Sequence, residues 1–536
     1  MRVPLVYKPG IQRNAGDFQD EYCIDGQWIR FVNGRIRKMK GQKEIYQPVG
    51  VDPTFLDMYF NGTNPVLIYT TINQVNRCIL NNELSNVTND RRVLDGLGGD
   101  TTRTWQSAKF IMNGVPYIAL LSTFNGNNML SNQNGVLFWK SMTDDNADFV
   151  SYEDGLIPGN NENIVSGGIL FSSPCLYLYG NNGTILRSKT SNPLDFDETG
   201  ENSDADSFSI SENKLLFGAS IRGGTNTPTF LFWTQNSVIY LTNVADGTNP
   251  RNPIEFHKEV ITTNSSVMSP KSIVQHDSLF FWLGTNRAFV YNGIVEPVKN
   301  DVNFEWFLEN VDLNKRQKIY GYKIDRYGEI RWAYPEIRYR NNPNIGCTRE
   351  IVYNVRENSW YDTTMQRDCI TVYEATGDIL SYGDSCTNYP YVPNNAYKSI
   401  WKHETGFYEV RRDNSVHNIP SFFTTPWFGY AAFPPAKDGK VMDKYIKITE
   451  IEPDFPAPEN YRRVDNELLV VGSATLKYAG VPKQNIVPIE FNLYTPNNRG
   501  KIDMRVQGRF VNLTFACVHP YTVGNILINF EIGDGQ

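Results

Sequence analysis

The sequence predicts an all-β protein built around a β-propeller, and three observations point to this fold class. Aromatic residues make up 13% of the chain, including 30 Tyr and 30 Phe, and aromatic side chains favour strands. Short apolar runs recur at close intervals and are punctuated by turn residues, among them Asn-Gly steps that begin at Asn33, Asn61, Asn113, Asn125, Asn134, Asn182 and Asn292. Amphipathic helix candidates are nearly absent, and the best is a short polar segment at residues 311–318.

Length separates a propeller from the other all-β architectures. Residues 51–435 continue in this style, whereas a single sandwich or barrel usually ends at roughly 200 to 250 residues. The segments FLFWTQNSVIYL (230–241) and LFFWLGTNRAFVYNG (279–293) both consist of a strand, a polar turn and a strand. No WD40 or kelch signature recurs, so the number of blades is not set by the sequence.

Two flanking regions differ in style from the propeller. Residues 1–50, rich in polar turns, are interpreted as an N-terminal arm or strand-addition segment. Residues 422–435 (FFTTPWFGYAAFPP) resemble a hinge or connector, which puts a boundary near Ala436. Alternating stretches such as KIDMRVQGRFVNLTFACV then predict a C-terminal β-sandwich-like domain at residues 436–536.

Composition limits the partners and the compartment. A net charge of -7 argues against a surface that binds nucleic acid everywhere, but it leaves room for a local basic patch. Seven scattered cysteines predict reduced thiols in a protein made in a cytoplasm, because disulfide frameworks usually use an even set. No export signal is visible and no run approaches 18 apolar residues, so no membrane-spanning segment is expected.

Candidate catalytic motifs do not satisfy the geometry that their chemistry requires. His403 and Glu404 resemble half of a zinc-binding motif, but the position of the second histidine is occupied by Phe407. His276, Asp277 and Ser278 are neighbours, and strand neighbours point to opposite faces. No phosphate-binding loop is present, since no Gly-Lys step is followed by Ser or Thr. We therefore expect a non-enzymatic protein with no cofactor and no metal.

One acidic segment keeps an alternative open. The stretch DFDETGENSDADSF contains Asp195, Asp197, Glu198, Asp204 and Asp206, and propellers that cleave glycosides use paired carboxylates. The stretch is polar and poor in aromatic residues, so a solvated acidic loop is the preferred interpretation. A carbohydrate-binding or carbohydrate-degrading propeller remains the alternative function.

The strongest candidate binding feature is a basic segment near the N-terminus. Residues 30–43 contain no acidic residue and six basic ones: Arg30, Arg35, Arg37, Lys38, Lys40 and Lys43. Such a cluster predicts contact with DNA phosphates or with acidic residues of a neighbouring ring. It also fits a solvated strand face, because alternation separates Arg35 and Arg37 from Ile36 and Lys38.

Several longer segments carry a family resemblance. They are DGQWIRFVNGRIRKMKGQKEI (25–45), ILRSKTSNPLDF (185–196), LFFWLGTNRAFVYNG (279–293), YGEIRWAYPE (327–336) with REIVYNVRENSWYD (349–362), IWKHETG (400–406) and IDMRVQGRFVNLTF (502–515). In this order they resemble the tail nozzle and packaged-DNA stabilisation proteins of short-tailed bacteriophages. The chain departs from that pattern in the long loop RYRNNPNIGC (338–347) and in the segment after Gly406.

The resemblance implies a structural subunit of the virion tail, assembled in the bacterial host cytoplasm. It implies a homo-hexameric ring beneath the head-to-tail adaptor or portal ring, with packaged double-stranded DNA in its lumen until ejection. Tail fibres, spikes or a plug or needle are the implied distal partners. A cellular interaction scaffold is a third possibility, carried only by fold analogy. The host, the tail appendages, the gating mechanism and the lumen-facing residues are not set by the sequence.

Overall fold

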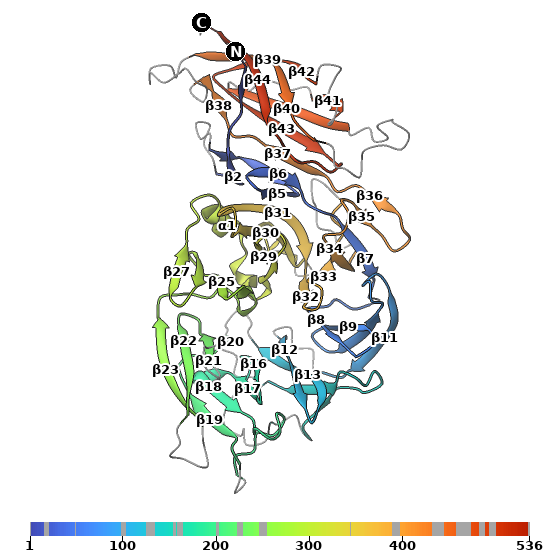
Figure 1. Ribbon diagram of the computed structural model, residues 1–536, viewed down its shortest axis with the longest axis vertical. Coiled ribbons are helices and arrows are strands. Elements are labelled where there is room, and N and C mark those ends of the chain that lie inside the picture. The colour runs from blue at the N-terminus through green and yellow to red at the C-terminus, as the bar shows by residue number, and fades with distance from the viewer. Residues whose placement is uncertain are drawn as a thin grey trace.

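A computed structural model gives the three-dimensional structure of the chain (Figure 1). It describes residues 2–14, 21–48, 50–97, 103–124, 135–153, 157, 165–199, 203–221, 229–245, 254–342, 345–387, 397–430, 444–456, 473–481, 488–492 and 500–533. Nearly all regular structure in these ranges is β-strand, which confirms the all-β prediction.

The central part of the chain is a β-propeller, whose blades follow one another around a ring in Figure 1. Six blades are four-stranded antiparallel sheets of consecutive strands. The first three blades consist of β8 (Phe55–Phe60), β9 (Pro65–Thr70), β10 (Val75–Leu80) and β11 (Val87–Leu94); β12 (Arg103–Met112), β13 (Val115–Phe124), β14 (Leu137–Ser141) and β15 (Val150–Ser151); and β16 (Gly168–Ser172), β17 (Cys175–Tyr179), β18 (Thr184–Arg187) and β19 (Asp206–Ser209). Blades four to six consist of β20 (Phe217–Ile221), β21 (Thr229–Trp233), β22 (Val238–Ala245) and β23 (Ile254–Thr262); β24 (Val274–His276), β25 (Leu279–Leu283), β26 (Ala288–Tyr291) and β27 (Val295–Val298); and β28 (Tyr320–Ile324), β29 (Glu329–Tyr334), β30 (Cys347–Asn354) and β31 (Ser359–Arg367).

The seventh blade is completed by a strand from the N-terminal region. It consists of β32 (Cys369–Tyr373), β33 (Asp378–Gly383), β34 (Ser399–His403) and, antiparallel to β34, β7 (Gln42–Tyr46). The short strands β35 (Glu409–Val410) and β36 (Val416–His417) extend this sheet beyond β7. Because β7 precedes the first blade and pairs with the last, it closes the ring and leaves no open seam between blades.

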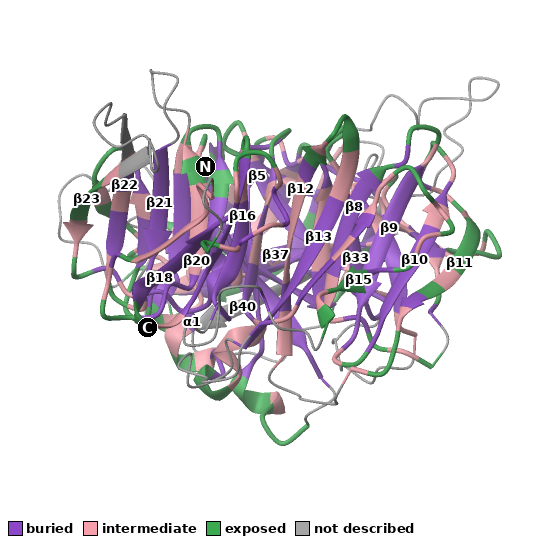
Figure 2. Ribbon diagram, turned by 90° about the horizontal axis from the view of Figure 1, so that it is seen from below, coloured by how far each residue is buried: buried purple, intermediate pink, exposed green. Residues whose placement is uncertain are grey.

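Apolar packing between blades forms the core of the propeller. Among the described residues, seven buried clusters lie between adjacent blades, one for each neighbouring pair around the ring. Tryptophans reinforce several of these contacts: the Trp105 indole donates to the Thr71 carbonyl at 3.0 Å, and the Trp332 indole donates to the Ser272 carbonyl at 2.7 Å. The burial pattern is visible in Figure 2, where the strands are mostly purple and exposed residues collect in the loops.

A two-layer β-sandwich lies beside the propeller, at the top of Figure 1. One sheet has the order β1 (Arg2–Pro4), β44 (Ile526–Gly533), β39 (Tyr445–Pro453) and β42 (Ile502–Gly508). The other has the order β4 (Asp25–Gln27), β37 (Ser421–Thr424), β43 (Phe510–Cys517), β40 (Ser473–Val481) and β41 (Ile489–Asn492), and β38 (Phe428–Gly429) also pairs with β43. Each sheet therefore contains an N-terminal strand.

The N-terminal segment joins the sandwich to the propeller. Between β1 and β7 it forms β2 (Lys8–Ile11), β3 (Tyr22–Cys23) and the hairpin of β5 (Ile29–Val32) and β6 (Arg35–Lys38). Its apolar residues, including Trp28, Phe31 and Ile36, belong to the same buried cluster as the sandwich core and Tyr361 of blade six. The outermost strand of blade six, β31, is buried along its whole length because this segment covers it. Of the described strands between residues 2 and 48, β1 and β4 are thus added to the sheets of the sandwich and β7 to a sheet of the propeller.

Two local predictions need correction. Residues 422–435, interpreted as a connector, begin with strands of the sandwich in their described part, because Phe422 to Thr424 pair with both β4 and β43. The α-helix near residues 311–318 lies earlier, at α1 (Phe304–Asn310), where Phe304 and Phe307 bury an apolar face. Residues Leu313–Lys318 form the 3₁₀ helix η4, whose first turn is capped by the Asp312 side chain. Within the described ranges, three further 3₁₀ turns are η2 (Asn181–Gly183), η3 (Pro270–Ser272) and η5 (Ile337–Tyr339).

Closure of the ring predicts a strong effect at Gly41, directly before β7. A Cβ atom at Gly41 would lie 2.0 Å from the Tyr408 carbonyl oxygen, so Gly41→Ala must displace the closing strand. We expect a loss of about 2 to 3 kcal/mol in the free energy of unfolding, measured by urea denaturation. Gly377→Ala is the control, because Gly377 has a φ of +72° but open space around it and should lose only about 1 kcal/mol. Equal losses at the two positions would contradict the closure argument.

Candidate functional site

A buried ion-pair network lies where the N-terminal hairpin meets blades six and seven. Arg30 of β5 is 1% exposed, and its Nε lies 3.1 Å from an oxygen of fully buried Glu329. Its Nη1 donates to Glu404, directly after β34, at 2.9 Å, and its guanidinium lies 3.8 Å from the ring centre of Tyr327. Burial opposes the charge on Arg30, but the two carboxylates raise its pKa above the ordinary value. Arg30 is therefore a fixed cation inside the junction.

The network continues into blade six. Arg331 donates to Glu329 at 2.7 Å and to Glu350 at 3.1 Å. The Tyr361 hydroxyl donates to Glu329 at 2.7 Å, and the Tyr322 hydroxyl donates to Glu350 at 2.8 Å. Each buried carboxylate thus has a cation and a phenol as partners. Such complete pairing is what allows charges to stay buried, since an unpartnered one would be strongly destabilising.

Lys38 of β6 has a structural role on the opposite face of the hairpin. It is 1% exposed, and its ammonium donates to the carbonyls of Ile419, at 2.9 Å, and Val518. Burial lowers the pKa of Lys38 to about 7. Lys38 therefore ties the hairpin to the sandwich and is not available to a partner.

The remaining basic residues of the predicted cluster are separated by the fold. Arg35 is exposed, and Arg37 and Lys40 are partly exposed near the junction. Lys43 lies on β7, paired opposite Lys402 of β34 in blade seven. The predicted single surface of six cations is therefore corrected: Arg30 and Lys38 are buried, Lys43 belongs to another sheet, and only Arg35, Arg37 and Lys40 remain at the outer side of the hairpin.

Sequence reasoning missed the acidic partners of this site. Glu329 and Arg331 lie within YGEIRWAYPE, where an alternation of charged and aromatic residues was the only available signal. Glu404 was considered as part of a metal motif, but it accepts hydrogen bonds from Arg30, and the pKa of its carboxyl is held low by that guanidinium against the opposing effect of burial. His403 is buried, and burial lowers its pKa well below the ordinary value, so it remains neutral.

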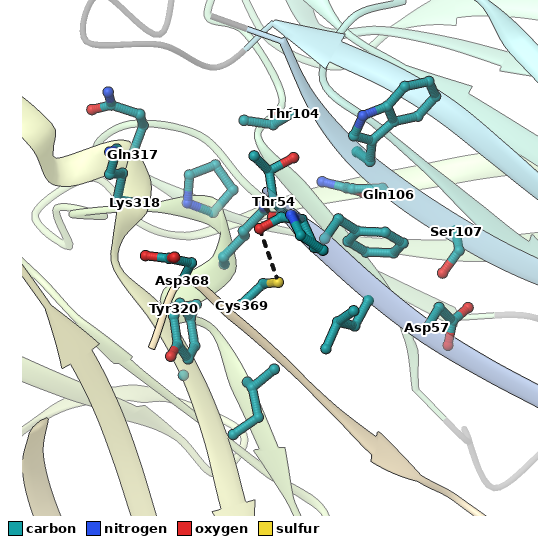
Figure 3. Close-up of a pocket in the computed structure, with 18 of the residues that line it drawn as sticks. Thr54, Asp57, Thr104, Gln106, Ser107, Gln317, Lys318, Tyr320, Asp368 and Cys369 are labelled. Atoms are coloured by element: carbon teal, nitrogen blue, oxygen red, sulfur yellow. Dashed lines mark hydrogen bonds between the residues drawn. The ribbon is translucent and has the colours of Figure 1, made fainter. Parts of the chain in front are cut away.

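A second candidate site is a cavity of about 830 Å³ along the propeller axis. It is lined by the innermost strands β8, β12, β16, β20, β28 and β32 and by η3. Figure 3 shows Asp57, Asp368 and Cys369 around it. Asp57 pairs with Lys109 at 3.1 Å, and Asp368 pairs with Lys398 at 2.9 Å. The acidic charges in the lining are thus largely neutralised by neighbouring lysines.

Two cysteine thiols in the lining of this cavity, Cys347 and Cys369, are held in hydrogen bonds to backbone carbonyls. The Cys369 thiol donates to the Pro53 carbonyl at 3.5 Å, the contact drawn in Figure 3, and burial raises its pKa far above the ordinary value. The Cys347 thiol donates to the Lys318 carbonyl, and burial raises its pKa as well. These thiols stay protonated and are poor nucleophiles. The described residues that line the cavity include no histidine.

The acidic segment considered for glycoside chemistry is used to brace its own loop. Asp195 pairs with Lys189 at 2.8 Å, and the Asp204 carboxylate accepts from the Thr190 amide at 3.2 Å. Asp197 accepts from Thr199 at 2.9 Å.

The other candidate motifs are not assembled into reactive sites. His276 contacts Asp325 at 3.1 Å rather than Ser278. Within the described ranges, no group of histidine, cysteine and acidic side chains has the arrangement of a metal site.

Known proteins resemble this chain in fold and not in sequence. No family model matches the chain, and no curated protein sequence matches it. Solved structures with similar folds include BBS1N in complex with ARL6DN (10% identity, TM-score 0.40, covering 68% of this chain and 98% of that one). The fucose-specific lectin from Aleuria aurantia has 8% identity and a TM-score of 0.30, and the match covers 61% of this chain and 95% of the lectin. The WD40 domain of Toxoplasma gondii coronin has 9% identity and a TM-score of 0.34, and the match covers 74% of this chain and 93% of that domain. The β-propeller fold is the class of protein established for this chain.

Among the described helices, none is long and apolar enough to cross a membrane.

Removal of the Arg30 charge should destabilise the junction. Arg30→Met keeps the length of the side chain but leaves buried Glu329 with one cation fewer. We expect the free energy of unfolding to fall by about 3 to 5 kcal/mol, measured by urea denaturation followed by tryptophan fluorescence. Arg35→Met, at an exposed position, should change it by less than about 0.5 kcal/mol. Similar losses in both variants would disprove the structural role of Arg30.

The lowered pKa of Lys38 predicts a pH dependence of stability. In the unfolded chain a lysine has a pKa of about 10.4, whereas folded Lys38 has a pKa of about 7. Between pH 7 and pH 10 the unfolded state therefore keeps a proton that the folded state has released. Raising the pH through this range should therefore stabilise the native protein relative to Lys38→Met. The measurement compares urea midpoints of the two proteins at several pH values. A difference between them that stays constant with pH would show that Lys38 remains charged when buried.

Proposed function

We propose that this chain is a structural subunit of a short-tailed bacteriophage tail, in the nozzle or DNA-stabilisation ring that surrounds the DNA conduit. Its work in this proposal is mechanical: it forms part of the wall, retains packaged DNA and joins the adaptor to distal tail parts. A site made of fixed, paired charges supports this mechanical role.

The observation that carries the proposal is a convergence of five of the seven segments that resemble the family; residues 185–196 and 279–293 lie in other blades. Residues 25–45 provide the hairpin, residues 327–336 and 349–362 provide β29, β30 and the start of β31, and residues 400–406 include Glu404. Arg30 contacts Glu329 and Glu404, and the rings of Phe31 and Tyr361 lie 5.4 Å apart. Residues 502–515 join through β43, which pairs with β37 beside β4. Segments scattered along the sequence thus form one junction.

The form of this junction supports a mechanical role. Gln27 makes two hydrogen bonds with the backbone of Thr364, at 2.9 and 3.1 Å, and the Asn354 side chain donates to the Phe31 carbonyl at 3.2 Å. Together with the ion pairs, these contacts leave the propeller and the sandwich little freedom to move relative to each other. A subunit in a pressurised conduit requires this kind of rigid coupling between its parts.

Assembly tests the proposal directly. Electron microscopy of the purified chain, alone and with the adaptor protein encoded near it, should reveal closed rings with cyclic symmetry, since heterologous contacts between identical subunits close into rings. The gene should lie among other virion genes. A protein that stays monomeric with and without tail components would contradict the proposal, and glycan binding that is lost on changing its acidic residues would favour the carbohydrate alternative.

A further inference from the structure

The hairpin β5–β6 has two chemically different faces. Arg30 is paired directly with Arg37, and Val32 with Arg35, so these four side chains lie on one face of the hairpin. Phe31 is paired with Ile36 on the other face, which packs into the sandwich core. The first face is therefore cationic: Arg30 points into the junction, and Arg37 and Arg35 follow it outward with increasing exposure.

A fourth cation reaches the same place from a distant part of the sequence. Arg326 lies in the turn between β28 and β29, with its guanidinium 5.6 Å from the ring centre of Tyr327, the same ring that Arg30 covers at 3.8 Å. Lys40, just after β6, has a pKa lowered by burial and by the positive charges of Arg326, Arg37 and Arg30, against the opposing effect of the Glu404 carboxylate. Like charges are thus gathered closely enough to repel one another.

The neighbouring carboxylates are already engaged. Glu404 is paired with Arg30, and both oxygens of Glu357 accept backbone amides of Asn33 and Gly34, at 2.6 and 2.9 Å. Asp325 contacts Lys323 at 3.2 Å and His276 at 3.1 Å. Four neighbouring cations have no ion pair with a described carboxylate, that is, no carboxylate oxygen within 4.0 Å of their side-chain nitrogens: Arg35, Arg37, Lys40 and Arg326. Four cations without a close ion-pair partner thus lie together in a chain whose net charge is -7.

The surroundings of these cations favour a nucleic acid over a protein as the partner. Protein interfaces have a buried apolar or aromatic centre, whereas DNA interfaces are polar and strongly positive. None of the large apolar side chains that are exposed among the described residues lies on the hairpin or in the turn between β28 and β29. Three of the four cations are arginines, whose planar guanidinium groups match phosphate oxygens.

We propose that Arg35, Arg37, Lys40 and Arg326 form a binding surface, the junction patch, for the phosphate backbone of double-stranded DNA. Arg30 does not contact DNA in this scheme; it holds the hairpin against Tyr327 so that the two cationic segments stay together. The proposal rests on the tail function proposed above, because a conduit subunit is exposed to DNA, and it names the surface that the DNA contacts.

The test is fluorescence anisotropy of a short, labelled DNA duplex titrated with the full chain at several salt concentrations. We expect the variant with glutamine at all four patch positions to bind at least about tenfold more weakly at low salt. The slope of log affinity against log salt should decrease by about 0.9 for each phosphate that the variant no longer neutralises. Melting temperatures of both proteins establish that the variant remains folded.

A control variant carries the same change in net charge at exposed positions outside the patch: Lys258, Arg287, Lys299 and Arg505, each replaced by glutamine. Arg287 lies at the end of β25 opposite to the His276–Asp325 contact, and hence on the other face of the propeller. Equal weakening in both variants, or no binding of the duplex by the native chain, overturns the junction patch. A patch variant that binds DNA normally but no longer self-associates also overturns it, in favour of an acidic protein surface.

The two proposals fail in distinguishable ways. A patch variant that still forms rings in electron micrographs but binds DNA as the native chain does would remove the junction patch and leave the tail function standing. A native chain that forms no ring with or without tail components would remove the tail function, whatever its affinity for DNA.

Discussion

The rest of the structure depends on the ion pairs of Arg30 with Glu329 and Glu404. The three residues come from the N-terminal hairpin, blade six and the end of blade seven; Arg30 and Glu329 are buried where they meet, and Glu404 is partly buried. A buried charge is tolerated only when its partners are present and correctly oriented. Any arrangement that moved the hairpin away from these blades would strand charges in an apolar interior, so the network selects one relative position of propeller, hairpin and sandwich.

The same segment completes both domains. Strand β7 closes the last blade, β1 and β4 extend the two sheets of the sandwich, and the hairpin between them fills the junction. These strands are made first, but their partners β34, β37 and β44 lie hundreds of residues later. Pairing across such separations is slow to form, since loop closure must precede it. Once formed, it couples the two domains into a single body.

Positive charge is used in two ways within a few residues. Arg30 is buried as a cation between carboxylates, and Lys38, whose pKa burial lowers to about 7, is buried against backbone carbonyls; both hold the junction together. Arg35, Arg37 and Lys40 stay at the outside, where Arg326 adds to their field and the nearby carboxylates are occupied elsewhere. The first group gives the surface its rigidity, and the second gives it cations that have no described carboxylate within ion-pair distance. A fixed array of cations binds a regular polyanion with little loss of conformational entropy.

By itself the sequence determined the all-β class and the propeller, because Asn-Gly turns, aromatic strands and the lack of helices are local signals, and it located the basic segment. It did not determine the seven blades, whose repeats are degenerate because each pair of neighbours packs with different side chains. Residues 422–435 resembled a connector because prolines and aromatics are equally common in linkers and edge strands. Only the tertiary structure decided which of the six basic residues are buried and that Arg326 joins the others, since these depend on contacts between segments about 300 residues apart in sequence.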